Sequence, residues 1–367
     1  MHGHHGRQRP TRTDALADGA SDQLVPLQSL DLGRVRSFDD LARGMSLTSF
    51  AGRAVGEAAD VLEAMVRDPD CIVVCTLSGA MTVAKMGLVL CDMIDAGWVQ
   101  AVVSTGALMA HGFVEATGRT HFKVDPAISD DEYYEKGYDR VYDTLELEKN
   151  LDEVEELVRH VLEAWDPAVT LSSVAFHDAL GAYLARHTQG RGVLRSAHEK
   201  QVPVYVPAFT DSELGLDVAL HIQRAHRAGR PPVRYDGFAD LEHFKERILA
   251  APRCGIFTIG GGVPRNWAQQ VGPYLDITKK RLGIDVPQRR FSYGVRICPE
   301  PAHWGGLSGC TYTEGVSWGK FVPPAEGGRY AEVFADATVA WPLVILAVAE
   351  RCRRDPPKPK SFRISVR

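Results

Sequence analysis

Residues 254–262, Cys-Gly-Ile-Phe-Thr-Ile-Gly-Gly-Gly, decide the fold, because a short apolar run rich in β-formers leads directly into three glycines. Such continuous apolar runs are typical of strands that are buried on both faces of a sheet. A segment with helical periodicity follows, and strands that alternate with helices predict a parallel, doubly wound α/β sheet. The same pattern recurs in four further runs, at residues 71–76, 99–104, 202–206 and 330–334.

The helices expected between these runs have recognisable ends. We expect one to reach about Ala96, where Gly97 stops it, and another to begin at about Glu213. Two more are expected to end near Leu282 and Cys352. Ligands of such sheets lie beyond the carboxyl ends of the strands, which is where the small residues of this chain gather.

Length and composition indicate an ordinary globular protein. The chain has 367 residues, of which 45% are hydrophobic and 24% charged, and its net charge of -5 argues against a general polyanion binder. We find neither a membrane-spanning stretch of about 20 apolar residues nor a secretory signal. Seven scattered cysteines favour a reducing compartment, and we expect a cytoplasmic enzyme.

The two ends of the chain differ from its middle. Residues 1–24 are predicted to form a disordered tail, whose three early histidines are either solvated or bind metal weakly. Residues 25–352 contain no dividing linker and are predicted to form a single α/β domain. Residues 353–367 form a basic tail, expected to be a solvated extension, with contact to a neighbouring subunit or an anion as the alternative.

Residues 125–166 form a strongly acidic segment, with 15 acidic and four basic residues. Asn150 followed by Glu153 matches the capping pattern of a helix start. The segment is interpreted as a helix with a solvated acidic back, or as a source of negative field that attracts a polycation. The apolar residues of the expected helix share one face: Leu151, Val154, Leu157, Val158, Val161, Leu162 and Trp165.

The three glycines at 260–262 favour an anion site. Glycine lets backbone amides approach a phosphate closely, and the helix N-terminus that follows adds positive potential. The sequence Gly-Gly-Gly-Val-Pro-Arg lacks the third glycine of the dinucleotide fingerprint, so a simple tight turn is the alternative.

Residues 314–320, Glu-Gly-Val-Ser-Trp-Gly-Lys, carry the most informative chemistry. If the stretch is extended, Glu314, Trp318 and Lys320 point to one side. Desolvation beside the indole lowers a lysine pKa, which an imine-forming lysine needs, while the carboxylate and the indole can hold a cationic amine. The alternative is an exposed lysine after a turn and a core tryptophan.

Four motifs, in matching order, resemble the deoxyhypusine synthase family: VPAFTDSELG (206–215), TIGGGV (258–263), EGVSWGK (314–320) and FADAT (334–338). The resemblance runs from about Phe38 to Cys352. It implies a Rossmann-like, NAD-dependent enzyme that forms homotetramers, with active sites between paired subunits.

The resemblance also implies a mechanism. NAD takes a hydride from the carbon beside a polyamine nitrogen, Lys320 retains the four-carbon unit as an imine, and an acceptor amine then takes that unit. Lys320 is the implied nucleophile. The residues implied to bind the amine substrate are Glu314, Trp318, Ser308, Gly309, Asn266, Asp217 and His303. Those implied to bind NAD are Ser78, Ser104, Thr105, Gly106, Asp211, Gly260, Gly261, Gly262, Ala335 and Asp336, and for the two aspartates a helix N-cap is the alternative.

This chain departs from the family pattern at the substrate end. Asn266 replaces a histidine, Leu108-Met109-Ala110-His111 replaces a paired-glutamate signature, and the expected acid after Gly215 is displaced to Asp217. His303 and His111 are candidates for the missing proton-transfer group, with a structural histidine as the alternative for each. These departures resemble the deoxyhypusine synthase-like branch of bacteria and archaea, in which small amines replace the protein lysine as acceptor.

We predict no metal site. Cys71 and Cys75 lie four residues apart without a second pair at ligand spacing, and no HExxH motif, Walker motif or Ser-His-Asp signature occurs. Cys310 is interpreted as a reactive thiol near the pocket or as a buried one.

The leading hypothesis is therefore NAD-dependent transfer of an aminobutyl group from spermidine or putrescine, or of a guanidinobutyl group from agmatine, giving a homospermidine-type product. The alternatives are a true deoxyhypusine synthase and a catalytically silent NAD-binding homologue. We expect no nucleic-acid partner.

Overall fold

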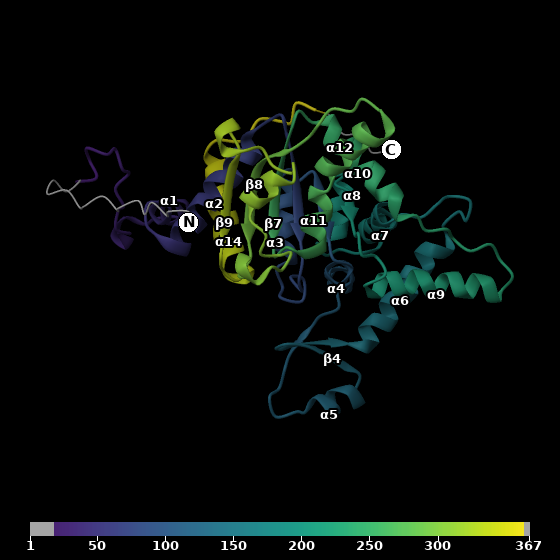
Figure 1. Ribbon diagram of the computed structural model, residues 1–367. Coiled ribbons are helices and arrows are strands. Elements are labelled where there is room, and N and C mark those ends of the chain that lie inside the picture. The colour runs from purple at the N-terminus through teal and green to yellow at the C-terminus, as the bar shows by residue number, and fades with distance from the viewer. Residues whose placement is uncertain (1–17, 363–367) are drawn as a thin grey trace, which may run out of the picture.

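A six-stranded parallel sheet forms the centre of the molecule, and a small three-stranded antiparallel sheet projects from it (Figure 1). The computed structural model describes residues 18–362. The strand order of the large sheet is β6-β2-β1-β7-β8-β9, and that of the small sheet is β3-β5-β4. The strands are β1 Cys71–Leu77, β2 Ala101–Ser104, β3 Phe122–Lys123, β4 Tyr138–Val141, β5 Thr144–Leu147, β6 Val204–Tyr205, β7 Arg253–Ile259, β8 Phe291–Ile297 and β9 Arg329–Val333.

Helices cover both faces of the large sheet. The helices are α1 Phe38–Ser46, α2 Phe50–Arg67, α3 Gly87–Asp95, α4 Gly106–Ala116, α5 Asp130–Glu135, α6 Glu148–Glu163, α7 Ser173–His187, α8 Val193–Glu199, α9 Glu213–Arg227, α10 Gly237–Ala250, α11 Gly262–Gln269, α12 Val271–Leu282, α13 Tyr312–Ser317 and α14 Ala337–Arg354. One core cluster joins the sheet to α2, α3, α4, α8 and α14, and the other joins it to α10, α11 and α12. The prediction of a doubly wound α/β fold is confirmed.

Strand β1 illustrates why the apolar runs form this sheet. All seven of its residues are buried, between β2 on one side and β7 on the other, and both pairings are parallel. Val73 and Cys75 face one core cluster, while Ile72 and Val74 face the other. A strand covered on both faces needs apolar residues at every position, which explains the absence of polar alternation in the sequence.

Several element ends differ from the expectation. The helix before Gly97 begins only at Gly87, although Gly97 stops it in the left-handed conformation, with φ 73°, as expected. The helical stretch after the glycines consists of two helices, α11 and α12. Strand β8 was not predicted. Tyr293 and Arg296 interrupt its apolar pattern, and Arg296 is nevertheless fully buried in the structure.

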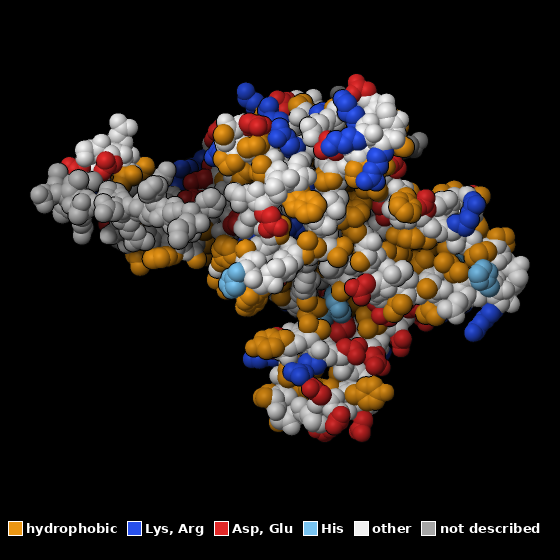
Figure 2. All heavy atoms as spheres, viewed as in Figure 1, with side chains coloured by type: hydrophobic (Ala, Val, Ile, Leu, Met, Phe, Trp, Pro, Cys, Tyr) orange, Lys and Arg blue, Asp and Glu red, His pale blue; other side chains and the backbone are white. Residues whose placement is uncertain are grey.

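The acidic segment builds the projecting unit rather than a helix alone. Its first part forms α5, β4 and β5, and Figure 2 shows acidic side chains gathered there. The predicted cap at Asn150 is wrong, because α6 begins at Glu148. The Asn150 amide instead donates hydrogen bonds to the Thr120 carbonyl and to Glu146. The predicted apolar face is confirmed: its residues are buried in, or packed against, one core cluster.

The C-terminal segment packs back onto the body of the molecule. The Lys360 ammonium donates to the carbonyls of Val66 and Asp68, and the Ser361 amide donates to the Pro69 carbonyl. The described part of this tail, residues 353–362, is mostly exposed, as expected for a solvated extension, but Lys360 and Ser361 anchor its end to the segment that follows α2. Residues 1–17 of the predicted N-terminal tail lie outside the described residues, and nearly all of residues 18–24 are exposed.

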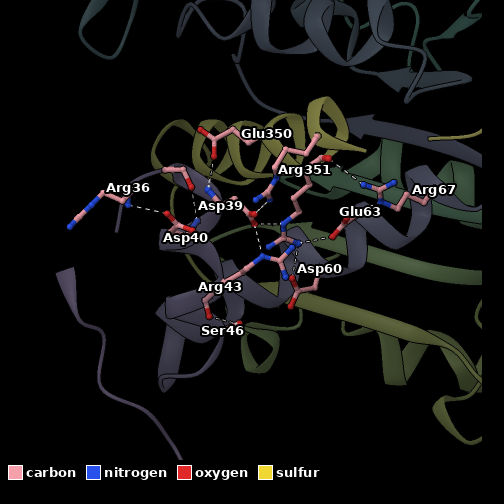
Figure 3. A network of polar contacts seen from close by, with 12 residues as sticks. Arg36, Asp39, Asp40, Arg43, Ser46, Asp60, Glu63, Arg67, Glu350 and Arg351 are labelled. Atoms are coloured by element: carbon pink, nitrogen blue, oxygen red, sulfur yellow. Dashed lines mark hydrogen bonds and ion pairs between the residues drawn. The ribbon is translucent and has the colours of Figure 1, made fainter. Parts of the chain in front are cut away.

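Arg351, near the end of α14, ties that helix to α1 and α2 (Figure 3). Its guanidinium lies 2.5 Å from Asp39, 2.7 Å from Asp60 and 3.0 Å from Glu63. Arg351 and Asp39 are both almost completely buried. This ion cluster fixes the helices that flank β8 and β9 at one edge of the sheet.

No helix among residues 18–362 is both long enough and apolar enough to cross a membrane. All seven cysteines are free thiols, and six of them are buried.

Candidate active site

The turn after β7 brings glycine backbone against two serines. The Gly261 amide donates to Ser78 Oγ at 2.8 Å, and Ser78 follows the neighbouring strand β1. Gly260 has φ 75°, and a Cβ there would lie 2.2 Å from Ser78 Oγ. A Cβ on Gly261 would lie 2.5 Å from the Ser308 Cα. The glycines thus allow three segments to meet at one edge of the sheet, a closeness that any side chain would prevent.

Two further strand ends lie at the same edge, because the strands are parallel. Ser104 ends β2, Thr105 caps α4 by accepting a hydrogen bond from the Leu108 amide, and Gly106 begins that helix. A Cβ on Gly106 would lie 2.2 Å from the Cβ of Ser212, which caps α9. The N-termini of α4 and α9 therefore approach each other closely.

The two aspartates assigned to NAD lie at helix starts beyond strand ends, and both are exposed. Asp336 caps α14, since its carboxylate accepts from the Thr338 amide at 2.8 Å. Asp211 does not cap α9, because Ser212 does. Ala335 is partly buried and packs against the core.

This edge fits a dinucleotide. Backbone amides at the starts of α4 and α11 are suited to phosphates, and exposed carboxylates suit ribose hydroxyls. NAD, if held here, would contact this edge of the sheet through its phosphates and riboses. The close approach of Gly261 and Ser308 joins the same edge to the segment that carries Lys320.

A cavity of about 230 Å³ lies beside that contact. Lys320 extends into it and is only 8% exposed. Its Nζ donates to Asn266 Oδ1 at 2.9 Å and lies 5.7 Å from the centre of the Trp318 ring. The cavity is lined by Arg265, Asn266, Gln269, Gln270, Leu307, Cys310, Glu314, Gly315, Trp318 and Lys320.

The stretch 314–320 is not extended, so the condition under which its side chains were expected to share one side is not met. Tyr312–Ser317 form helix α13, capped by Thr311, and Gly319 turns the chain with φ 69°. Glu314 and Trp318 still share a side because residues four apart are neighbours on a helix. The Lys320 carbonyl then accepts from the Phe291 amide, which fixes the lysine beside the start of β8. The carboxylate, the indole and the amine therefore meet as predicted, by a different local route.

The alternative interpretation, an exposed Lys320 and a core Trp318, is wrong. Trp318 is 64% exposed and Lys320 is buried, so the tryptophan is not a core residue. Burial lowers the pKa of Lys320 below the usual value of a lysine, and the nearby charge of Arg265 lowers it further, whereas Cys310 and Glu314 act in the opposite direction. Its hydrogen-bond partner Asn266 is neutral. The site thus favours a neutral, nucleophilic amine.

Arg265 is a second buried cation at this cavity, 2% exposed. Its guanidinium lies 5.2 Å from the centre of the Tyr312 ring, and Nη1 lies 3.4 Å from the Ser308 carbonyl. Arg296, from β8, donates to the same carbonyl at 2.7 Å. Two arginines therefore fix the Ser308 carbonyl. Ser308 and Gly309, both predicted to bind the substrate, are not among the residues that line the cavity.

Three other predicted residues do not line this cavity. Asp217 is buried in α9, where desolvation and the charges of Glu213 and Glu155 raise its pKa to about 7. His303 is exposed in the short 3-10 helix Ala302–Trp304. His111 contacts Glu146, away from the residues that line the cavity.

Sequence reasoning missed Arg265, Gln269, Gln270 and Leu307. A signal was present for part of this set, since Gln269 lies three residues after the recognised Asn266 on α11 and four after Arg265. Leu307 belongs to a loop, for which no periodicity is available.

A doubly wound parallel sheet with a glycine turn at its carboxyl edge belongs to the dinucleotide-binding α/β class. Comparison with known proteins then identifies the family. The model of the deoxyhypusine synthase family matches residues 40–348, and the chain belongs to that family.

Curated relatives agree with this assignment. The chain is 34% identical over 319 residues to "Probable deoxyhypusine synthase 2" of Methanosarcina mazei, covering 87% of this chain and 88% of that protein. It is 32% identical to "Deoxyhypusine synthase-like protein" of Chlorobaculum tepidum, covering 82% and 83% of the two chains. The crystal structure of a proposed deoxyhypusine synthase from Entamoeba histolytica superposes with a TM-score of 0.56 at 13% identity, covering 88% and 96%, which supports the fold.

Family membership establishes the coarse chemistry. Deoxyhypusine synthases are NAD-dependent enzymes that act on polyamines and transfer aminobutyl groups. The resemblance noted from four short motifs is thereby confirmed over most of the chain.

Proposed function

We propose that the protein transfers a four-carbon unit from a polyamine to a small acceptor amine through an imine on Lys320. The unit is aminobutyl if the donor is spermidine or putrescine, and guanidinobutyl if the donor is agmatine. The product is a longer polyamine of the homospermidine type. One observation carries the proposal: the Lys320 amine is buried in a cavity beside Glu314 and Trp318, with a neutral hydrogen-bond partner.

Bound NAD supplies the redox chemistry, since it accepts a hydride from the carbon beside the donor nitrogen and later returns it. Lys320 Nζ, in its neutral form, adds to the oxidised carbon, and the original amine leaves with the proton that Lys320 loses. The four-carbon unit is then held as an imine on Lys320. The acceptor amine attacks the same carbon and releases Lys320, so the lysine is regenerated.

The surrounding residues orient the donor. Glu314 supplies the carboxylate and Trp318 the aromatic face that can hold a second, cationic nitrogen of the donor. Asn266 accepts from Lys320 and can hold the amine toward the substrate. Burial excludes water, which would otherwise hydrolyse the imine.

A small acceptor is favoured over a protein lysine by the side chains at the substrate end. Asn266 replaces the family histidine, and Leu307 adds an apolar wall to a cavity of about 230 Å³. This volume is below the roughly 300–1,000 Å³ of drug-sized sites and suits a slender alkylamine. A true deoxyhypusine synthase and a silent NAD-binding homologue remain the competing functions, and the experiment below distinguishes them.

A second copy of the chain is proposed to cover the open side of this cavity. Trp304 is 72% exposed, Leu307 46% and Trp318 64%, and such apolar residues near one site mark a protein contact. We therefore propose a homotetramer with its active sites between paired subunits.

The proposal is tested by trapping the imine. The full-length protein is incubated with NAD and spermidine, putrescine or agmatine, reduced with borohydride and digested for mass spectrometry. A four-carbon adduct on Lys320 supports the transferase, and its mass distinguishes an aminobutyl from a guanidinobutyl unit. Adding a second small amine should release the adduct as a longer polyamine.

The matched control is Lys280→Ala, which removes an exposed lysine of α12 and should leave adduct formation unchanged. Lys320→Ala should abolish it while NAD still binds. Release of the unit only to a translation-factor lysine would replace the small-amine proposal by true deoxyhypusine synthase activity. NAD binding without any adduct would contradict the transferase.

A further inference from the structure

Two histidines and a glutamate meet where the projecting unit joins the body of the molecule. His111 comes from α4, His121 from the segment before β3, and Glu146 from β5. His111 Nδ1 lies 3.0 Å from Glu146 Oε2, and His121 Nε2 lies 2.8 Å from the same oxygen. Three elements that are distant in the sequence therefore converge on one carboxylate oxygen.

The cluster is buried. The side chains of His121 and Glu146 are 0% and 1% exposed, and that of His111 is 19% exposed. The two imidazole rings lie edge to face, with centroids 5.6 Å apart and planes inclined by 62°. Both imidazoles are turned toward one carboxylate. Because the His111 ring reaches the surface, an ion could approach the three groups from solvent.

The contact between His121 and Glu146 is not a regular hydrogen bond. Although Nε2 and Oε2 are 2.8 Å apart, the ring N–H is not aligned with the oxygen, and Nε2 has no other hydrogen-bond partner within residues 18–362. A buried ring nitrogen without an aligned partner is costly unless something else satisfies it. A cation bound between the two groups would use the nitrogen lone pair and the carboxylate together.

The ligand types and spacing suit a first-row divalent ion. Two imidazoles and one carboxylate are the donors of three-ligand zinc sites, whose bonds of about 2.0–2.2 Å leave a fourth position open. The three donor atoms already lie within 4.8 Å of one another. Ion binding requires the present contacts to widen by roughly a few tenths of an ångström, which side-chain rotation can supply.

The second layer of residues is also arranged around the donors. Glu115 lies 3.5 Å from His121 Nδ1, and the Asn150 amide donates to Glu146 Oε1. A carboxylate behind a ligating histidine and a hydrogen bond to a ligating carboxylate are typical of metal sites. Lys85 lies 2.8 Å from His121 Nδ1 and pairs with Glu115. With neutral imidazoles, two carboxylates and one ammonium leave the cluster one negative charge.

We propose that His111, His121 and Glu146 bind a zinc-class divalent ion that fastens the small sheet to α4. The ion binds through His111 Nδ1, His121 Nε2 and Glu146 Oε2. Glu115 then accepts the Nδ1 proton of His121, and Lys85 withdraws from that nitrogen. This proposal is independent of the reaction at Lys320.

The test uses Zn²⁺ and Co²⁺ on full-length protein that has been stripped with a chelator. Because the N-terminal histidines can also bind metal, the reference protein carries His2→Ala, His4→Ala and His5→Ala. Calorimetry should find one Zn²⁺ per chain in this reference. Co²⁺ should give the visible absorption of a four-coordinate ion, and Zn²⁺ should raise the unfolding temperature.

Variants then locate the ion. His121→Ala and Glu146→Gln should each weaken Zn²⁺ binding by about 100-fold or more. Lys85→Met should strengthen it, since the competing ammonium is removed, and this variant keeps the three ligands intact. His226→Ala, at an exposed histidine of α9 outside the cluster, is the control and should leave Zn²⁺ binding unchanged.

A failed fold is recognised separately. Circular dichroism reports whether each variant is folded, and if His121→Ala is not, His111→Gln at the partly exposed ligand takes its place. Stoichiometric Co²⁺ absorption that disappears in a folded ligand variant supports the site. Absence of Zn²⁺ binding in the reference protein, or binding that the folded ligand variants leave unchanged, overturns it.

Discussion

Arg351 and Lys320 are both buried cations, but different groups surround them. Three carboxylates, Asp39, Asp60 and Glu63, contact the Arg351 guanidinium (Figure 3). Among residues 18–362, the Lys320 amine has one hydrogen-bond partner, the neutral side chain of Asn266. The charge of Arg351 is balanced by carboxylates, and the residue holds helices together. Lys320 has no carboxylate as a hydrogen-bond partner among the described residues and is therefore suited to react as a neutral amine.

The pKa values of Asp39 and Lys320 reflect this difference in surroundings. Burial alone would raise the pKa of Asp39, but hydrogen bonds from Arg351, Arg43 and Arg354 outweigh it and hold the pKa below its usual range. At Lys320 desolvation dominates, and the pKa falls. Burial among three carboxylates thus stabilises a charge in one region, whereas burial beside a neutral partner disfavours the charged form in the other.

The largest effect is expected from Lys320→Met, which removes the amine and keeps the volume. Transfer should fall by about 10⁴-fold or more, because the nucleophile is lost. Stability should not fall at neutral pH. The folded state disfavours the charged lysine, so this residue costs stability below its depressed folded pKa, and the cost is relieved as pH rises toward the ordinary value of about 10.4. Steady-state rates and thermal unfolding at several pH values measure both effects.

Lys280→Met is the control for that change, since it removes an exposed lysine. If Lys320→Met retains substantial transfer, Lys320 is not the nucleophile and does not differ in function from the structural cation Arg351.

Arg351→Met should act on stability instead. It leaves the buried Asp39 without its main partner, and breaking a buried pair costs about 3–5 kcal/mol. The free energy of unfolding, measured with denaturant, should fall by that amount, while transfer per folded molecule stays near the wild-type value. Arg353→Met, at an exposed arginine of the same helix, should cost much less. Equal costs for the two variants would contradict the role of the ion cluster.

Asn266→Asp converts the neutral partner of Lys320 into a charged one. An opposite charge at this distance raises a lysine pKa by about 1–3 units. The neutral fraction of Lys320 then falls, so transfer at neutral pH should drop by about 10-fold or more and its pH profile should shift upward. The rate is measured from pH 6 to 10. An unshifted profile would mean that Lys320 protonation does not limit the reaction.

The smallest effect is expected from Asp217→Asn. Asp217 is a buried acid whose pKa is raised to about 7, so folding favours its protonated form, and its contribution to stability is lost as pH rises from about 4 through 7. The variant should be more stable by about 1–3 kcal/mol at pH 8 and unchanged at pH 4. Transfer should persist, because Asp217 does not line the cavity. Loss of transfer with unchanged stability would instead place Asp217 at the substrate.

The sequence predicts the sheet because its buried strands are mostly apolar without polar alternation, as in β1 and β7. It predicts β8 poorly, since Arg296 is buried by contacts with the Ser308 and Cys310 carbonyls that no local pattern reveals. The acidic segment predicts only a helix, because short antiparallel strands such as β4 and β5 show weak alternation of apolar and polar residues.

The sequence predicts which residues form the site better than it predicts how they are arranged. Glu314, Trp318 and Lys320 were recognised from one motif, although α13 brings the first two together rather than a strand. Asn266 was singled out by its departure from the family pattern, and its hydrogen bond to Lys320 required the fold. His111 was singled out for a different role, and nothing in the sequence linked it to His121 and Glu146, because the three residues are spread over three elements.

Competitive acetylation tests the central claim most directly. The full-length protein is labelled with trace acetic anhydride over a range of pH, and mass spectrometry follows the Lys320 peptide, with the denatured chain as reference. We expect Lys320 to become reactive at a pH below the ordinary lysine pKa of about 10.4, and below the midpoint of the same peptide in the denatured chain. A midpoint equal to or above the denatured reference would contradict it.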